Sequence, residues 1–337
     1  EGGHRTFLSR SARCSHDRAE KKVEGSTSIC HEVGTALSAN WMLPQSEVEC
    51  MGGVCHLSIV RVHRESIGLD ARMNETHETN RHFWDRISDY WRRLREEDKH
   101  FLRLTTEPEL AFEGGLLEVI RGALPDLKEI DVAVVGSGDN YVAFALAGLG
   151  AKVTSIDISQ AQLDVARARA TELGLEISFH RSDAADLHGL QDESFDLVVS
   201  SNGFYVWISD PSAVFASIHR VLRSEGHYAF YDVHPFTRPW DGEGSPLTMK
   251  KTYWETGPLY EEDSDNIEFN WTLADLLNPL VRCGLRLVEL RESPPVSSRT
   301  WQGHSYQEPA DDKELMDWQV NTRAGLPMWL TVHAQKP

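Results

Sequence analysis

Short apolar runs alternate with helix-like segments between residues 130 and 235, and this alternation constrains the fold more than any other feature of the chain. The predicted strands are IDVAVVG (130–136), KVTSIDI (152–158), EISFHRSD (176–183), FDLVVSSNG (195–203) and HYAFYDVHP (227–235). Helices are predicted at 140–150, from Ser159 to Gly174, and from Asp210-Pro211 to Gly226. Strands that alternate with helices form a parallel, doubly wound sheet with helices on both faces. We therefore predict an α/β fold.

The segments on either side of this region also show regular patterns. Residues 79–104 place Phe83, Ile87, Tyr90, Trp91 and Leu94 at helical spacing, which predicts an amphipathic helix, and residues 112–124 predict a second one. After Pro235 the pattern becomes irregular as far as Asn270. A helix (272–284), a strand (285–293) and a last strand (327–336) follow. Irregular segments in such folds cover the ligand-binding end of the sheet, so we expect a lid there.

Net charge limits the classes of partner. The 337 residues carry a net charge of −18, which repels phosphate backbones, so we expect no nucleic acid partner. No apolar run approaches the roughly 18 residues that a spanning helix needs, so we expect no membrane partner. Residues 1–72 contain nine basic and nine acidic residues, and the whole −18 therefore lies in residues 73–337.

Residues 1–72 differ from the rest of the chain in their cysteines as well. Four of the five cysteines precede Met73, and three of the four lie beside a histidine, but no pair has the CxxC spacing typical of zinc sites. We predict no metal, and interpret 1–72 as a poorly structured extension of a domain that begins at Met73. Cys283, isolated in an amphipathic stretch, fits a reducing, cytoplasmic location.

The glycine-rich turn GSGDNY (136–141) after the first predicted strand indicates a nucleotide-like ligand. It lacks the GK[ST] ending of a P-loop, which excludes phosphoryl transfer chemistry of that kind. A dinucleotide fingerprint would have its third glycine at position 141, where Tyr141 stands instead. Asp157 follows Gly138 by 19 residues, a spacing that suits a carboxylate binding a ribose diol. The turn therefore favours a ligand that has a ribose and no pyrophosphate.

Five motifs in register carry a resemblance to a known family. They are VVGSGDN (134–140), SIDIS (155–159), RSDAADL (181–187), SFDLVVSSNGF (194–204) and VLRSEGHYAFYDVHP (221–235). On these motifs, residues 73–337 resemble a class I S-adenosylmethionine-dependent methyltransferase of the small-molecule, methyltransferase-11-like type. The resemblance implies a seven-stranded sheet with an antiparallel last strand, a cofactor half at about 126–235 and a lid insert at about 236–270.

The resemblance also implies which residues hold S-adenosylmethionine. Gly136, Ser137 and Gly138 would pass beneath its methionine part, Asp157 would bind the ribose hydroxyls, and Ile158 would lie against adenine. Asp183 with Ala184 would face the adenine amino group. Ser201 and Asn202 would lie beside the sulfonium.

Two positions depart from the family pattern. Asn140 replaces a third small residue, and Val134 and Val135 stand where the family often has an acid that binds the cofactor's ammonium group, a role that Asp139 would partly take over. Asp139 and Asn140 could instead cap the following helix. Gln162 lies where the family packs a side chain on adenine, but its spacing from Ser159 favours a capping box.

A small-molecule methyl acceptor is implied, and its site would include Tyr205, Trp207, Tyr231, His234, Arg238 and Trp240. His234, Tyr231 and Tyr205 are the catalytic candidates, with His234 the best base or else a structural histidine that anchors the lid. Trp207, Trp240, Trp254 and Trp271 would form an aromatic wall or pack the lid. The alternatives are a non-catalytic S-adenosylmethionine-binding regulatory protein and, further off, an NAD(P)-dependent oxidoreductase.

Overall fold

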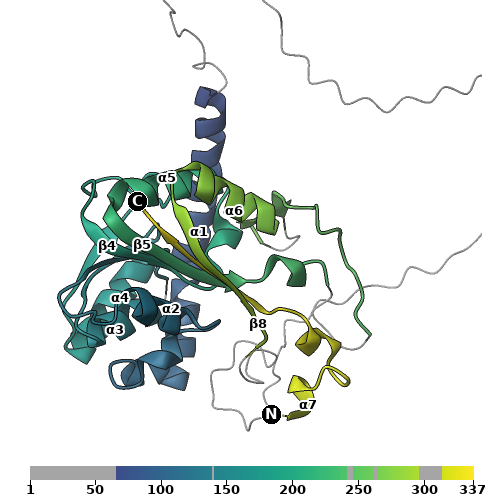
Figure 1. Ribbon diagram of the computed structural model, residues 1–337, viewed down its shortest axis with the longest axis horizontal. Coiled ribbons are helices and arrows are strands. Elements are labelled where there is room, and N and C mark those ends of the chain that lie inside the picture. The colour runs from purple at the N-terminus through teal and green to yellow at the C-terminus, as the bar shows by residue number, and fades with distance from the viewer. Residues whose placement is uncertain (1–65, 139, 241–245, 261–263, 296–312) are drawn as a thin grey trace, which may run out of the picture. The chain divides into compact units, whose positions relative to one another are not determined.

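A seven-stranded sheet forms the centre of the protein in the computed structural model, which describes residues 66–337 except 139, 241–245, 261–263 and 296–312 (Figure 1). The strand order is β3-β2-β1-β4-β5-β9-β8. The bounds are β1 Asp131–Val135, β2 Lys152–Asp157, β3 Ile177–Arg181, β4 Phe195–Ser200, β5 Leu222–Val233, β8 Arg286–Ser293 and β9 Trp329–Gln335. β1 to β5 are mutually parallel, and β9 runs antiparallel to both of its neighbours. The predicted doubly wound, mostly parallel sheet with an antiparallel last strand is confirmed.

Helices cover both faces of this sheet (Figure 1). α2 (Leu116–Ala123), α3 (Tyr141–Gly148) and α4 (Gln160–Leu173) pack on one face, and α5 (Pro211–Val221) and α6 (Leu273–Arg282) pack on the other. α1 (Ser66–Asp98) packs along α4. The remaining described elements are short, namely α7 Lys313–Met316, a hairpin of β6 Leu259–Tyr260 and β7 Ile267–Glu268, and 3₁₀ turns at His100–Arg103, Pro108–Ala111, Tyr205–Trp207, Pro235–Thr237 and Thr322–Gly325.

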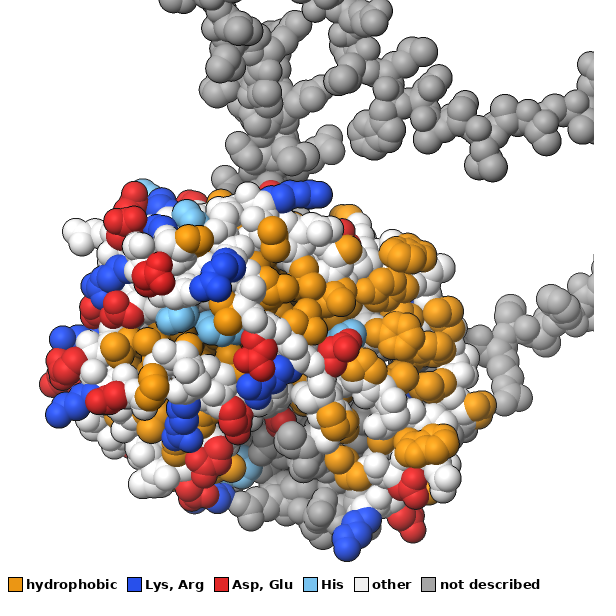
Figure 2. Space-filling model, viewed as in Figure 1, with side chains coloured by type: hydrophobic (Ala, Val, Ile, Leu, Met, Phe, Trp, Pro, Cys, Tyr) orange, Lys and Arg blue, Asp and Glu red, His pale blue; other side chains and the backbone are white. Residues whose placement is uncertain are grey.

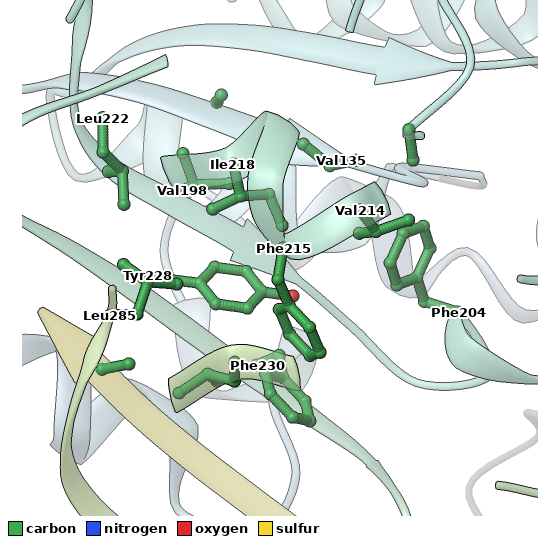
Figure 3. Packing of buried hydrophobic residues seen from close by; sticks show 14 of the residues in the cluster. Val135, Val198, Phe204, Val214, Phe215, Ile218, Leu222, Tyr228, Phe230 and Leu285 are labelled. Carbon is green, nitrogen blue, oxygen red and sulfur yellow. The ribbon is translucent and has the colours of Figure 1, made fainter. Parts of the chain in front are cut away.

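An apolar core lies on each face of the sheet, because successive side chains of a strand point to opposite faces. In β1, Val132 and Val134 contribute to the core under α2, α3 and α4, whereas Ala133 and Val135 contribute to the core under α5 and α6. Figure 3 shows the second core, where Phe215 of α5 lies against Tyr228 and Phe230 of β5. A strand that is apolar on both faces must be covered on both, so the continuous apolar runs of this sequence require the doubly wound arrangement.

The helix predicted from Asp210 to Gly226 ends earlier than expected. Asp210 accepts hydrogen bonds from the N–H groups of Ser212 and Ala213, as its N-cap position predicts, but the helix ends at Val221. Leu222 begins β5 and pairs with Phe195, and its side chain is fully buried. Apolar residues are buried in both elements, so the apolar pattern alone did not reveal where the helix became a strand. The β6–β7 hairpin was not predicted either.

α1 is the predicted amphipathic helix, but its inner stripe mixes polar with apolar residues. Of the five apolar positions predicted to pack, Tyr90 is 51% exposed and the other four are partly buried. His77, Asn80, Ser88 and Arg95 are buried as well, and these four positions lie three to eight residues apart along one helical stripe. The apolar pattern identified the helix but not the polar residues on its inner side. The backbone of α1 begins at Ser66, so the helix crosses the predicted domain start at Met73; the extension predicted for 1–72 and its four cysteines lie mainly outside the described residues.

Polar side chains attach α1 to the rest of the protein. Asn80 donates from Nδ2 to the carbonyl oxygens of Trp207 (3.2 Å) and Ile267 (2.9 Å), and its Oδ1 accepts from the N–H of Ile267 at 2.8 Å. Asp85 accepts from the Ser159 hydroxyl at 2.6 Å and from the N–H of Ala161 at 3.3 Å, at the start of α4. α1 is therefore held over the ends of the strands by hydrogen bonds as well as by packing.

Hydrophobic and charged side chains are unevenly distributed on the face shown in Figure 2. Hydrophobic side chains gather on the right half of this face, and the left half mixes acidic with basic side chains (Figure 2). Basic residues that alternate with acids form no continuous positive stripe there. Among the described residues, no helix is both long and apolar enough to cross a membrane.

We expect Asn80→Ala to destabilise the protein by about 1–3 kcal/mol, because a buried N–H and two carbonyl oxygens lose their partner. Urea unfolding of the variant measures this loss. Thr79→Ala is the matched control, since the Thr79 hydroxyl bonds only to the Glu75 carbonyl on the exposed face of the same helix. Equal stability of the two variants would contradict the assigned role of Asn80.

Candidate functional site

A cavity of about 430 Å³ opens at the carboxyl ends of β1 to β4, beneath α1. This volume lies within the range of about 300–1,000 Å³ that small-molecule sites occupy. Nine of the eleven residues predicted to hold the cofactor line it, namely Gly136, Ser137, Gly138, Asp157, Ile158, Asp183, Ala184, Ser201 and Asn202. The topology explains this convergence, because parallel strands bring their following loops to the same edge of the sheet.

The glycine turn has two glycines with different tasks. Both have positive φ, +65° at Gly136 and +49° at Gly138. A Cβ at Gly136 would lie 2.2 Å from the ring of Phe204, so this glycine is required by a packed side chain. A Cβ at Gly138 would meet nothing within 4 Å, which leaves its backbone open to the cavity. The sequence assigned close ligand approach to both glycines; the geometry supports that role for Gly138.

We expect Gly136→Ala to destabilise the fold by more than the roughly 1 kcal/mol that a left-handed residue costs, because the new methyl group also collides with Phe204. Gly138→Ala is the matched variant, since it carries the backbone cost without the collision. Thermal unfolding of the two variants gives the comparison. A midpoint for Gly136→Ala equal to or above that of Gly138→Ala would be incompatible with the packed ring.

Asp157 connects the glycine turn to the start of α4. Its Oδ2 accepts from the N–H of Gly138 at 2.8 Å, and its Oδ1 accepts from the N–H of Ser159 at 2.9 Å. The side chain is 8% exposed, and burial raises its pKa to about 6, against the opposing effect of these N–H groups. Each carboxylate oxygen keeps a lone pair for a further donor, which is what a diol would supply.

Asp183 is oriented by a histidine that the sequence did not single out. His77 Nδ1 lies 2.7 Å from Asp183 Oδ2, while the N–H of Ser209 donates to His77 Nε2 at 3.1 Å. Nε2 is therefore the acceptor, and the imidazole proton on Nδ1 is donated to Asp183. Burial opposes ionisation of Asp183, but the hydrogen bonds from His77 and from the N–H of Ala185 outweigh it and lower the pKa of the carboxyl. Asp183 is thus an ionised acceptor at the edge of the cavity.

Asn140 does not line the cavity. It is fully buried with φ +69°, which asparagine tolerates, and Nδ2 donates to the Gly138 carbonyl at 2.5 Å. Its Oδ1 accepts from the Ser155 hydroxyl, to which the Ser137 hydroxyl donates in turn at 2.9 Å. No side-chain cap forms at this helix start. Asn140 therefore shapes the turn from behind, neither contacting the cavity nor capping the helix, and Asp139 lies outside the described residues.

Gln162 has a different position from the predicted capping box. The Ser159 hydroxyl accepts from the Gln162 backbone N–H at 3.2 Å, but the N–H of Ser159 donates to Asp157 instead of to the Gln162 side chain. The Gln162 side chain is buried and lines the cavity. Of the two hydrogen bonds in the predicted capping box, only the one accepted by the Ser159 hydroxyl is confirmed.

The three catalytic candidates do not line the cavity, and their placement is the main correction to the predicted site. The Tyr205 hydroxyl lies 2.7 Å from that of Tyr228, in the core, and burial raises its pKa far above the ordinary range. Tyr231 packs edge-on against Trp329, with ring centroids 5.6 Å apart. Tyr205, Tyr231 and His234 are each at least 94% buried, because the turn after β4 and the end of β5 that carry them are covered by packed side chains.

His234 has the structural role that the sequence allowed as its alternative. Its Nδ1 accepts from the N–H of Phe236 at 3.1 Å, and its Nε2 lies 2.9 Å from Glu292 Oε1. Burial lowers the pKa of His234, and the opposing effect of Glu292 is smaller. The ring therefore joins the 3₁₀ turn after β5 to β8.

Aromatic side chains do line the cavity, but most differ from those predicted. Of the four tryptophans proposed as a wall, only Trp207 lines it; Trp254 is 77% exposed, and Trp271 stacks on Phe269. Trp240 packs edge-on against Phe236. The aromatic residues that join Trp207 are Trp84, Trp91 and Phe204.

α1 supplies the functional residues that sequence reasoning missed. His77, Asn80, Trp84, Trp91 and Arg95 line the cavity from this helix. Trp84 packs edge-on against Trp207, with ring centroids 5.1 Å apart. The spacings of three, four, seven and four residues were a detectable signal, since they put all five residues on one face of a helix.

The comparisons with known proteins agree with this geometry. Residues 133–230 match the family described as a methyltransferase domain. Two curated relatives are ubiquinone biosynthesis O-methyltransferases. The one from Hahella chejuensis is 34% identical over 103 residues (31% of this chain and 42% of that protein), and the one from Pseudomonas syringae pv. tomato is 32% identical over 114 residues (34% and 47%). The chain thus spans less than half the length of the curated relatives it matches.

A solved structure extends the likeness to the fold. An S-adenosylmethionine-dependent methyltransferase from Mesorhizobium loti aligns with a TM-score of 0.51 and 24% identity, over 65% of this chain and 96% of that chain. The sheet with its flanking helices is therefore the Rossmann-like fold of these methyltransferases.

Proposed function

We propose that this chain, in which residues 133–230 match the methyltransferase domain family, transfers the methyl group of S-adenosylmethionine to a small-molecule acceptor. The observation that carries the proposal is the arrangement of Asp157 and Gly138 at a cavity whose lining also includes Trp84, Trp91 and Trp207. A carboxylate fixed by two backbone N–H groups beside an open glycine backbone suits a ribose followed by an extended methionine chain.

The residues present fit the cofactor. Asp157 would bind both ribose hydroxyls with its remaining lone pairs, and Asp183, oriented by His77, would accept from the adenine amino group. Ile158 and Ala184 would enclose the adenine ring, with Gly136 and Ser137 beneath the methionine part. Ser201 and Asn202, after β4, would lie beside the sulfonium. When bound, S-adenosylmethionine supplies an electrophilic methyl group and a neutral leaving group.

The chain's own contribution would be alignment and exclusion of water. Holding acceptor, methyl carbon and sulfur in line is worth about 7–11 kcal/mol in the best intramolecular models. Trp84, Trp91, Trp207 and Phe204 line the cavity and would exclude water from it. The catalytic candidates Tyr205, Tyr231 and His234 do not line it, so the proposal assigns none of them the task of a general base. The domain that carries this function would run from about residue 73 to 337, with its lid at 236–270.

A cavity of about 430 Å³, in the size range of small-molecule sites, supports a small acceptor over a macromolecular one. The two curated relatives are named for methyl transfer to oxygen in ubiquinone biosynthesis. For this chain we adopt only the coarser statement, an S-adenosylmethionine-dependent transfer to a small molecule, because the match covers part of those proteins.

We expect Asp157→Ala to weaken S-adenosylmethionine binding about 10- to 100-fold, the loss of hydrogen bonds to a charged acceptor. Calorimetry with S-adenosylmethionine, S-adenosylhomocysteine and NAD measures it. In the wild type without ligand, the carboxyl of Asp157 has a pKa of about 6. Its charged form is therefore present above that pH, and affinity should fall as pH decreases through 6. Asp157→Asn is the control, because without an ionisable group its weaker binding should not respond to this titration.

Binding of NAD alone, or undiminished S-adenosylmethionine binding by Asp157→Ala, would refute the cofactor assignment. A wild-type affinity that stays constant while pH decreases through 6 would refute the role of the Asp157 charge without touching the assignment itself.

Transfer itself is tested with methyl-labelled S-adenosylmethionine and a metabolite extract that has been separated into small molecules and macromolecules. We expect label to enter the small-molecule fraction, and to be lost with Asp157→Ala. Label confined to macromolecules would exclude a small acceptor. Cofactor binding without label in either fraction would favour a non-catalytic, regulatory role.

A further inference from the structure

The ionisable residues that line the cavity divide between its two ends. Asp157, Asp183 and the histidine hydrogen-bonded to it, His77, lie at the end that we assign to adenosine. Arg95 packs over the ring of Tyr141, at the first turn of α3, so it lies near the glycine turn after β1. Arg238 and Glu268 remain, and they come from the segments after β5.

Arg238 lies on the side of the cavity away from adenosine. It follows the 3₁₀ turn Pro235–Thr237 at the end of β5, and its backbone N–H donates to the Pro235 carbonyl at 3.2 Å. In the sheet, β4 separates β5 from β1, and β2 lies beyond β1. Counted from β5, the glycine turn after β1 and the ribose site at the end of β2 therefore both lie beyond β4. Arg238 is placed where an acceptor, and not the cofactor, would lie.

The guanidinium of Arg238 is poorly neutralised by the residues that the structure describes. Its one ion-pair contact among them is Asp232 Oδ1, 3.9 Å from Nη2. Asp232 already accepts from the N–H groups of Gly203, Tyr205 and Val233, at 3.0, 2.9 and 2.7 Å. These bonds direct its oxygens toward the loop after β4. Arg238, 26% exposed, therefore presents charge and hydrogen-bond donors to the cavity.

The other described charges near Arg238 offset one another. Glu268 also lines the cavity and accepts from Asn266 Nδ2 at 3.3 Å. Lys251, whose ammonium donates to the Glu255 carbonyl at 2.8 Å, lies close enough to be influenced by Arg238, Lys250, Glu255 and Glu268. Among the described residues, two lysines therefore balance two glutamates here, which leaves Arg238 with its distant contact to Asp232. A cationic acceptor would meet repulsion from Arg238, whereas an anionic one would meet a fork of donors.

We propose that Arg238 binds a carboxylate of the methyl acceptor, and that the acceptor is a flat aromatic acid held against Trp207. Guanidinium and carboxylate form paired, charge-assisted hydrogen bonds, and the tryptophan face packs an aromatic ring. Trp207 is itself held in place, because Asn80 donates to its carbonyl, Phe83 stacks on its ring and Trp84 packs edge-on against it. This inference rests on the proposed function and adds the chemical class of its acceptor.

The test compares benzoate with benzamide, two probes of the same shape that differ in charge, on protein saturated with S-adenosylhomocysteine. Binding is measured by ligand-observed NMR for the wild type, Arg238→Gln and Lys250→Gln. Lys250 is exposed and does not line the cavity, so Lys250→Gln removes one nearby positive charge without changing the site. We expect the wild type and Lys250→Gln to bind benzoate about tenfold or more tightly than benzamide, and Arg238→Gln to lose this preference.

Equal affinity of the wild type for both probes, no benzoate binding, or a preference that persists in Arg238→Gln would overturn the proposal. S-adenosylhomocysteine affinity is measured first on each variant. It should be unchanged in Arg238→Gln, which also shows that the variant folds; a tenfold loss would assign Arg238 to the cofactor's carboxylate and overturn the proposal. Failure of the wild type to bind S-adenosylhomocysteine contradicts the proposed function, whereas normal binding without a benzoate preference contradicts only this inference.

Discussion

The buried carboxylate of Asp157 organises the site. It stands at the end of β2 and binds the N–H groups of Gly138 and Ser159, so the turn after β1 and the start of α4 depend on one side chain. Behind the turn, Asn140, Ser155 and Ser137 form a buried chain of hydrogen bonds that holds the same backbone from the other side. These hydrogen bonds fix the glycine turn from both sides before any ligand binds. The arrangement buries Asp157, and this burial raises its pKa to about 6.

α1 completes the site from a distant part of the sequence. His77 orients Asp183 across 106 residues, and Asn80 reaches Ile267 across 187. Asp85 binds the Ser159 hydroxyl at the start of α4, so α1 and Asp157 act on the same serine. Ser159 consequently connects α1, through Asp85, to the glycine turn, through Asp157. A helix attached by buried polar groups is tied to specific partners, since each group left without one would be costly.

Prediction from the sequence succeeded where short-range patterns carry the information. The strands β1 to β5, their parallel arrangement, the glycine turn and the position of Asp157 could be predicted because periodicity and a spacing of 19 residues are local signals. It failed where burial depends on packing between distant elements. Leu222 was assigned to a helix because burial in α5 and in β5 produces the same apolar pattern. Tyr205 and His234 were expected in the site because both lie near strand ends, but their side chains face neighbouring layers.

The sequence by itself determined the α/β fold and the edge of the sheet where a ribose-containing ligand would bind, since alternating apolar segments and a glycine turn followed by Asp157 allow few other arrangements. Only the tertiary structure decided which side chains line the cavity at that edge. Trp84, Trp91 and Arg238 reach one cavity because α1 crosses the strand ends and the segment after β5 returns beside it. Such contacts join residues more than 100 positions apart, and the physical reason that they escape prediction is that no local pattern encodes which distant surfaces will meet.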